Sequence, residues 1–252
     1  MNDVSEVFQK IFQEKQYNSQ KRLENYLNKQ GEEEIHDLRT SIRRLESVYL
    51  ILPNSFKRKK IDSFVSTYKS LFKKISIIRD FDILIKKLLN NGLTEKSDFI
   101  LYLIRKKEKK IQETLMQAKN LSKISISHLN EGNPKKIIPK YERTIFSLVE
   151  LVQDLLPVVS SDKSKIEELH FMRKIVKKLR YILEIDPNNS YQYLIIQMKL
   201  LQKLLGTIHD CDMAINFLKK NSKKFPELEP FILREEENRN QIYKQLSDSL
   251  SE

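Results

Sequence analysis

The sequence predicts an all-α protein made of two similar halves, each an antiparallel four-helix bundle. Apolar residues recur at three- and four-residue spacing through most of the 252 residues, which is the period of an amphipathic helix. Glycines and prolines interrupt this period at widely separated points, as expected at helix ends. Alternation typical of a β-strand is nearly absent, and its one instance, KISISHLN at 123–130, falls between the halves.

Each expected helix lies between two such interruptions. The residues that separate periodic segments are Gly31, Gly92, Gly132, Pro53, Pro134, Pro157, Pro187 and Pro226, whereas Gly206 lies inside one. The expected helices are 4–29, 32–52, 57–90, 95–120, 136–156, 163–184, 189–220 and 226–250. The connections are short, so consecutive helices are expected to run antiparallel. A single domain, 1–252, would then consist of repeat 1 at about 4–121, a linker at about 122–134 and repeat 2 at about 135–250.

A duplicated motif indicates that the two halves share one plan. The segment EIHDLRTSIRRLES corresponds to LHFMRKIVKKLRYILE, with His36 paired to His170 and Arg39 to Arg173 at one offset of 134 residues. A second pair, KSLFKKISIIRDFDILIKKL and KLLQKLLGTIHDCDMAINFL, matches at an offset of 130 residues. That second offset pairs Lys73 with Lys203, Arg79 with His209, Asp80 with Asp210, and Asp82 with Asp212. The recurrence of two separate motifs favours an internal duplication.

The charge balance indicates an anionic partner. Lys and Arg number 46 against 34 Asp and Glu, for a formal charge of +12 at pH 7. Such a balance suits nucleic acid, a membrane surface or a phosphate polymer. The 4 glycines form neither GxGxxG nor GxxxxGK[ST], so an anion would be held by side chains or helix ends.

The composition also indicates the cellular compartment in which the protein is expected. The single Cys211 permits no internal disulfide, and the first ten residues, MNDVSEVFQK, lack the apolar core of a signal peptide. No run approaches 18 uninterrupted apolar residues, so no membrane span is expected. The bundle core needs the apolar face of each helix, which leaves none for a membrane surface. We expect a cytoplasmic protein.

Basic residues flank the apolar stripe in both copies of the first motif. A residue placed one after each apolar position lies about 100° round the helix, so His36, Arg39 and Arg43 run beside the buried seam. Such a stripe suits the wall of an anion-binding groove. The alternative is a solvated helix face with local partners, since Glu46 follows Arg43 by three residues and Glu184 follows Arg180 by four. Recurrence in one register favours the anion site.

The histidines and the DxD pairs give little support for catalysis. His128 lies in the linker, and the counterpart of His209 is Arg79, a replacement that keeps positive charge but not proton-transfer chemistry. On a continuous helix, residues two apart point roughly 200° from each other, so neither DxD pair is suited to a single metal ion. We expect their carboxylates to form ion pairs or a helix cap. We expect no cofactor.

The two motifs resemble the repeats of the CHAD family, the conserved histidine α-helical domain, over roughly residues 5–250. The resemblance implies two four-helix bundles related by a pseudo-twofold, a basic groove between them, and non-catalytic binding of inorganic polyphosphate. The residues implicated by the motifs and their paired helices are His36, Arg39, Arg43, Arg44, Lys73, Arg79, His170, Arg173, Lys177, Lys178, Arg180, Lys203 and His209. The resemblance also allows an association with polyphosphate granules in the cytoplasm. The oligomeric state is left open.

Two other functions stay open at this point. Binding of RNA or DNA would call for aromatic side chains that stack on the nucleobases, and only Tyr181 adjoins the basic stripe. A metal-dependent polyphosphate-processing enzyme would need a positioned metal or a histidine nucleophile. The basic runs KRKK at 57–60 and RKKEKK at 105–110 are interpreted as solvated helix faces.

Overall fold

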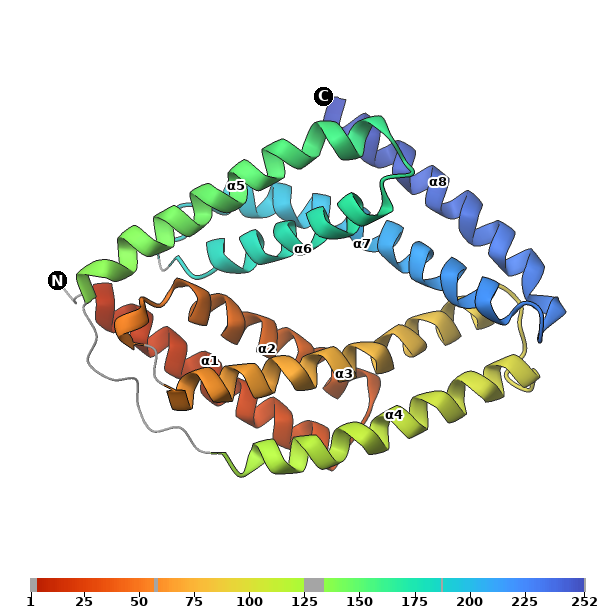
Figure 1. The fold of residues 1–252 in the computed structure, drawn as a ribbon, viewed down its shortest axis with the longest axis horizontal. Helices are drawn as coiled ribbons and strands as arrows, with labels where there is room; N and C mark the ends of the chain where they lie inside the picture. The colour runs from red at the N-terminus through yellow and green to blue at the C-terminus, as the bar shows by residue number, and fades with distance from the viewer. Residues whose placement is uncertain (1–3, 57–58, 125–133, 187, 252) are drawn as a thin grey trace. The chain divides into compact units, whose positions relative to one another are not determined.

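The regular secondary structure of the described residues consists of helices (Figure 1). The computed structural model describes residues 4–56, 59–124, 134–186 and 188–251; the linker residue His128 and most of segment 123–130 lie outside them. Over these residues there are eight α-helices, three short 3₁₀ helices and no strand, which confirms the all-α prediction. The α-helices are α1 (Val4–Asn28), α2 (Glu32–Ile51), α3 (Lys59–Asn90), α4 (Asp98–Ser122), α5 (Ile137–Ser161), α6 (Ile166–Leu183), α7 (Gln192–Asn221) and α8 (Glu229–Ser251).

The helix starts differ from the expected ones in a regular way. Helices α4, α6, α7 and α8 each begin three residues later than the apolar period predicts. Polar side chains in the preceding turns explain two of these delays. The Asp162 carboxylate accepts the backbone N–H of Ser164, and the Asp186 carboxylate accepts those of Asn188 and Ser190. Such bonds satisfy the backbone in a turn and so compete with the first turn of a helix.

Helix α5 continues through Pro157 to Ser161, so the expected end at residue 156 is wrong. A proline inside a helix costs about 3 kcal/mol through its missing N–H and the clash of its ring. Packing beyond the proline offsets this cost. Val159 is fully buried, and the Tyr243 hydroxyl lies within hydrogen-bond distance of the carbonyls of Val159 (2.9 Å) and Ser160 (3.1 Å).

The described helices divide between two compact units that do not coincide with the sequence repeats. One unit comprises Met1–Asp82 with Ile100–Thr144, and the other comprises Ile83–Phe99 with Ile145–Glu252. The 32 residues of α3 would span about 48 Å as a regular helix, which is longer than one small bundle. The end of α3 and the start of α4 therefore contribute to the second unit, and the start of α5 to the first.

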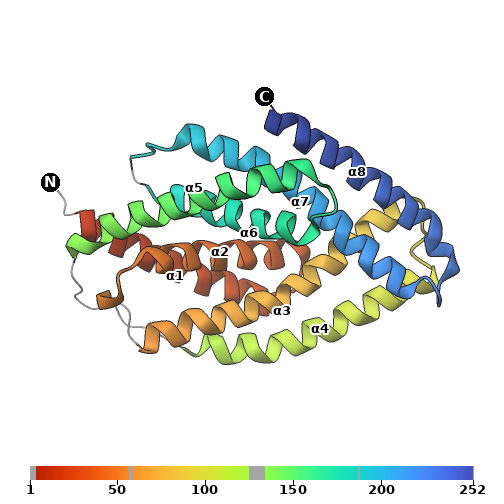
Figure 2. The same ribbon diagram turned by 45° about the horizontal axis from the view of Figure 1, so that its top comes forward.

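Each unit has its own apolar core. In the first, α1 packs on α2, and Phe8 of α1 lies 5.6 Å from Tyr141 between ring centres. In the second, α7 packs on both α6 and α8, and α7 and α8 lie side by side in Figures 1 and 2. There, Phe99 stacks edge-on against Phe225 at 5.0 Å, so the α3–α4 turn is anchored to the end of α7.

Helix α5 is more apolar than the sequence survey suggested. By length and composition it could cross a membrane, with Glu150 and Asp154 as the charged residues of its last 18 positions. One such helix is weak support for a span, because core helices of soluble proteins pass the same test.

Candidate functional site

The first unit holds two arginines of α2 over one aromatic ring of α3. The guanidinium carbons of Arg39 and Arg43 lie 5.6 and 4.9 Å from the centre of the Phe72 ring. Arg39 also donates from Nε to the Ser76 hydroxyl at 3.3 Å, and that hydroxyl donates to the carbonyl of Phe72 at 2.7 Å. The ring and the hydroxyl hold both cations beside the apolar seam, where the sequence placed them.

Other predicted residues of the first unit differ in their surroundings. His36 is exposed, and within the described ranges no hydrogen bond or ion pair to it was found. Lys73 is exposed on α3. Arg79 forms a close ion pair with Glu32 in the first turn of α2. An anion could approach His36 and Lys73 directly, whereas it would have to compete with Glu32 for Arg79.

Arg44 does not share the stripe of Arg39 and Arg43. It lies about 80° round α2 from His36, on the side that meets α1. There it lines a surface pocket of about 190 Å³. The other lining residues are Glu14, Lys15, Asn18, Arg22, Asp37, Thr40 and Ser41. The pocket carries both signs of charge, and Arg22 is paired with Asp37 at 2.7 Å, so it lacks the uniform charge of an anion site.

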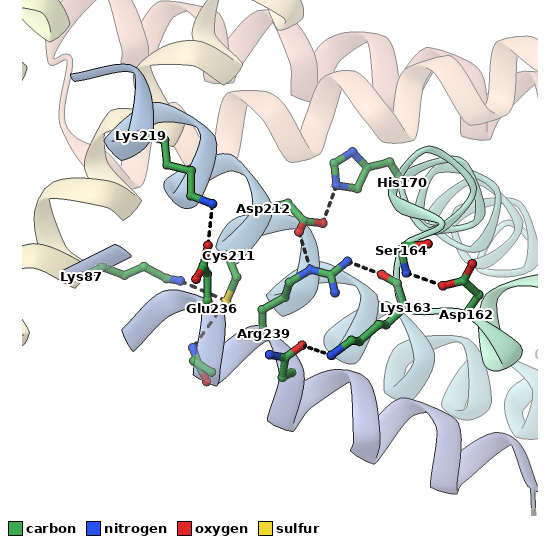
Figure 3. A network of polar contacts seen from close by, with 12 residues as sticks. Lys87, Asp162, Lys163, Ser164, His170, Cys211, Asp212, Lys219, Glu236 and Arg239 are labelled. Carbon is green, nitrogen blue, oxygen red and sulfur yellow. Dashed lines mark hydrogen bonds and ion pairs between the residues drawn. The ribbon is translucent and has the colours of Figure 1, made fainter. Parts of the chain in front are cut away.

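The second unit holds His170 at the end of a buried chain of polar contacts (Figure 3). Its Nε2 lies 3.0 Å from Oδ2 of Asp212 on α7. The other carboxylate oxygen of Asp212 accepts a hydrogen bond of 2.6 Å from Nε of Arg239 on α8. Arg239 in turn donates from Nη2 to the carbonyl of Lys163 at 2.8 Å. The chain thus connects α6, α7, α8 and the turn before α6.

The electrostatics of this chain fix the direction of its hydrogen bonds. Burial alone would raise the pKa of Asp212, but the hydrogen bonds from His170 and Arg239 and the Arg239 charge hold that pKa below its ordinary value. Asp212 is therefore a carboxylate at neutral pH and can only accept hydrogen bonds. Nε2 of His170 must carry the hydrogen that lies between them.

His209 lies against His170, with ring centres 4.6 Å apart. Burial, together with the charges of Arg173 and His170, lowers the pKa of His209, although a hydrogen bond to Asp210 opposes this. Burial would raise the pKa of Asp210, yet the His209 bond and the Arg173 charge keep it lowered. At neutral pH the His209 ring is therefore neutral, with Nδ1 donating to Asp210 at 3.1 Å, and its Nε2 accepts hydrogen bonds and donates none.

The remaining cations of the second unit lie on two sides of α6. Arg173 and Lys177 follow His170 on one stripe and are half-buried. Lys178 is exposed about 80° away from His170, as Arg44 is from His36. Arg180 already has two partners. Its Nη1 pairs with the Glu184 carboxylate at 2.8 Å, and its guanidinium carbon lies 4.2 Å from the centre of the Tyr181 ring. Lys203 is exposed on α7.

Two of the DxD carboxylates form ion pairs with a lysine or an arginine. Asp82 pairs with Lys107 of α4 at 2.5 Å and Asp212 with Arg239, while Asp210 and Asp212 also lie within hydrogen-bond distance of His209 and His170. Helices α3 and α7 run unbroken through both pairs, so the two aspartates of each pair point apart. Across the residues described, no cluster of three or more potential metal ligands was found.

Three residues that shape the sites were not identified from the sequence. Phe72 has the spacing of an ordinary core residue, and Lys107 was interpreted as part of a solvated run. Arg239 lies in the polar stretch REEENRNQ, which gives no sign that the side chain is buried. A possible signal was the offset of 132 residues between Lys107 and Arg239, close to the 130 and 134 of the two motifs.

The fold and these stripes define a class: an all-α protein that presents a duplicated histidine and arginine motif from two pairs of helices. A model of the CHAD domain family matches residues 8–219, which shows that the chain belongs to this family. The family is associated in general with polyphosphate binding.

A solved structure supports the assignment of the fold. The crystal structure of the CHAD domain from the plant Ricinus communis matches with a TM-score of 0.64 at 16% sequence identity. The match covers 98% of this chain and 89% of that chain. No curated protein matches the sequence.

Proposed function

We propose that this protein binds inorganic polyphosphate without catalysis, through the stripe of His36, Arg39 and Arg43 and its counterpart of His170, Arg173 and Lys177. The observation that carries the proposal is the arrangement of Arg39 and Arg43 over Phe72. Two cations held side by side match a polymer whose negative charges repeat along its length. Arginine adds a planar fork that can bind phosphate oxygens in pairs.

The proposal ranks the candidate residues. His36, Arg39, Arg43, Lys73, His170, Arg173, Lys177 and Lys203 are the proposed contacts. Arg79 and Arg180 serve as secondary contacts, because each already pairs with a glutamate. Arg44 and Lys178 contribute through long-range attraction, since they lie away from the stripes. His209 contributes by packing against His170.

The proposal includes the two-bundle duplication and the shared basic groove that the family resemblance implies. If one polymer chain uses both stripes, the two stripes depend on each other. Charge reversal in one stripe should then remove most of the affinity, and reversal in the second should add less than its separate effect. Two independent sites would give additive losses and two polymer fragments bound per protein.

The test is a titration of long-chain polyphosphate at two salt concentrations. We expect the logarithm of the binding constant to fall linearly with the logarithm of the salt concentration, because bound cations release counterions from the polymer. Arg39→Glu with Arg173→Glu should abolish binding while helicity by circular dichroism stays unchanged. Retained affinity in this variant at equal salt would overturn the proposed site.

A matched control separates the site from net charge. Lys119→Glu with Lys220→Glu makes the same change of four charge units at exposed positions of α4 and α7 outside both stripes. This control should retain most of the affinity. An equal loss in both variants would mean that binding follows net charge alone and would contradict the proposal.

Two further measurements address the alternatives. Single-stranded RNA should compete poorly with polyphosphate, because Tyr181 beside the second stripe is buried and the Phe72 ring of the first lies against Arg39 and Arg43, so neither ring is free to stack on a base. Polyphosphate incubated with the protein and Mg²⁺ or Mn²⁺ should keep its length on a gel. Preferred binding of RNA would favour the nucleic-acid function, and chain shortening would favour an enzyme.

A further inference from the structure

A buried carboxylate lies behind the leading histidine of the second stripe. Asp212 has 3% of its side chain exposed, Arg239 has 10% and His170 has 23%, so His170 is the most exposed of the three. In Figure 3, Asp212 lies on one side of the His170 imidazole, and no other labelled residue is bonded to the ring. No hydrogen bond of Nδ1 was found among the described residues. The ring is held at one nitrogen and open at the other.

The first repeat contains the same chain with one link left open. Asp82 is also buried, with 7% of its side chain exposed, and its Oδ1 binds Lys107 in place of Arg239. Its Oδ2, the oxygen that corresponds to the histidine acceptor of Asp212, is buried without a hydrogen-bond partner in the described residues. A buried acceptor left unsatisfied is unfavourable by roughly 1–3 kcal/mol. His36, the counterpart of His170, lies on the adjoining helix with its ring exposed.

The arrangement restricts what His170 can offer to a phosphate. Its Nε2–H is committed to Asp212, so only Nδ1 faces a ligand. In a neutral ring that already has a hydrogen on Nε2, Nδ1 carries a lone pair and is an acceptor. It could not form a hydrogen bond with a phosphate oxygen, which is also an acceptor. The ring must carry a second hydrogen, on Nδ1, to donate to the phosphate and to Asp212 at once.

The charges around the ring are mixed. Asp212 and Asp210 of α7 favour the protonated ring, whereas Arg173 and Lys177 of α6 and Arg239 of α8 disfavour it. His209 is neutral near pH 7 and adds little charge. An incoming phosphate adds negative charge on the open side of the imidazole. Binding of the polymer should therefore draw a proton onto the ring.

We propose that Asp212 is a positioning residue that holds His170 so that the polymer is bound by a doubly protonated imidazole. This inference rests on the proposed function and deepens it. His170 becomes a phosphate donor only as it takes up a proton, so polyphosphate binding is coupled to pH. Asp212 thereby acquires a role that is neither metal binding nor catalysis.

The test is calorimetric titration of the full chain with polyphosphate in two buffers of different ionisation enthalpy. The difference in heat gives the number of protons taken up. At pH 7.5, wild-type protein should take up protons on binding, because the incoming phosphate favours the second hydrogen on the ring. Asp212→Asn should lower this number to the value found for His170→Gln, and affinity should fall about tenfold, as for loss of one charge-assisted hydrogen bond.

Controls make each outcome decisive. Asp154→Asn removes an exposed carboxylate of α5 and should leave proton uptake unchanged. If Asp212→Asn fails to fold by circular dichroism, His170→Gln decides, because His170 lies at the rim. Wild-type proton uptake in Asp212→Asn or in His170→Gln would overturn the role of Asp212. Absence of any binding by wild-type protein would instead refute the proposed function.

Discussion

Loss of the Arg239 guanidinium should destabilise the second unit more than loss of the equivalent lysine destabilises the first. Arg239→Met removes the charge and keeps much of the side-chain volume. Asp212 would then be a buried carboxylate, with 3% of its side chain exposed, held by His170 alone. Removing one partner of a buried ion pair costs about 3–5 kcal/mol, and the remaining His170 bond brings the expected cost near the lower end, about 3 kcal/mol.

The matched comparison is Lys107→Met. Lys107 pairs with Asp82 at 2.5 Å but has 26% of its side chain exposed, so water can reach the carboxylate when the lysine is removed. Its expected cost is about 1 kcal/mol, because exposure weakens such pairs. The double variant Asp212→Asn with Arg239→Met should be more stable than Arg239→Met, since the uncompensated charge is gone.

Urea unfolding followed by circular dichroism measures these free energies, provided that the slope with urea is unchanged between variants. The pKa of Asp212 is lowered in the folded protein, so its ion pair stabilises the fold above the unfolded pKa, about 3.9, and loses this effect as pH falls. The difference in the free energy of unfolding between wild type and Arg239→Met should be largest at pH 7 and should shrink below about pH 4. A loss no greater than that of Lys107→Met, or a gap independent of pH, would refute the reasoning.

Three further predictions concern other parts of the chain. Phe72→Leu should weaken polyphosphate binding about threefold to tenfold by releasing Arg39 and Arg43 without changing the salt slope, as measured by titration at several salt concentrations; unchanged affinity would contradict the role of the ring. Gly206→Ala should raise the free energy of unfolding in urea by about 0.5–1 kcal/mol, because an added Cβ meets nothing within 4 Å in α7, whereas Gly92→Ala should lower it, because Gly92 has φ +99°. Thr114→Val should cost about 1–3 kcal/mol in the same assay by leaving the Tyr26 hydroxyl buried without its partner at 2.5 Å, and Tyr26→Phe with Thr114→Val should recover part of that loss; a double variant as unstable as the sum would exclude this explanation.

The helices could be predicted from the sequence because their period and their breaks were both clear. Gly31 and Gly92 fall at helix ends as expected, and each of the eight segments is a helix. Pro157 misled the prediction because a local signal for a break was outweighed by burial of Val159 and by the Tyr243 hydroxyl, which comes from a segment distant in sequence. Local patterns do not contain such tertiary partners.

The candidate sites were predictable only in part, for the same reason. Period and offset identified the stripes of His36 and His170, since both follow from residues on one helix. Which cation enters the interior depends on neighbouring helices. Lys107 and Arg239 are charged residues in highly charged stretches, and nothing in their spacing distinguishes them from exposed neighbours.

The two stripes differ in a way that would divide the response to pH. In the first, Arg39 and Arg43 rest on Phe72 and Ser76, whose counterparts at the offset of 130 are Gln202 and Gly206. These arginines stay charged at all physiological pH values, so their attraction for phosphate is constant. The second stripe lacks that ring and hydroxyl. It has instead two stacked histidines, a fixed tautomer at His170 and a neutral ring at His209. If both stripes arose by duplication of one site, the arginines of the first attract phosphate equally at all physiological pH values. The second stripe attracts phosphate more strongly as the pH falls. Polyphosphate affinity should then decline with rising pH to a plateau set by the arginines, and not to zero.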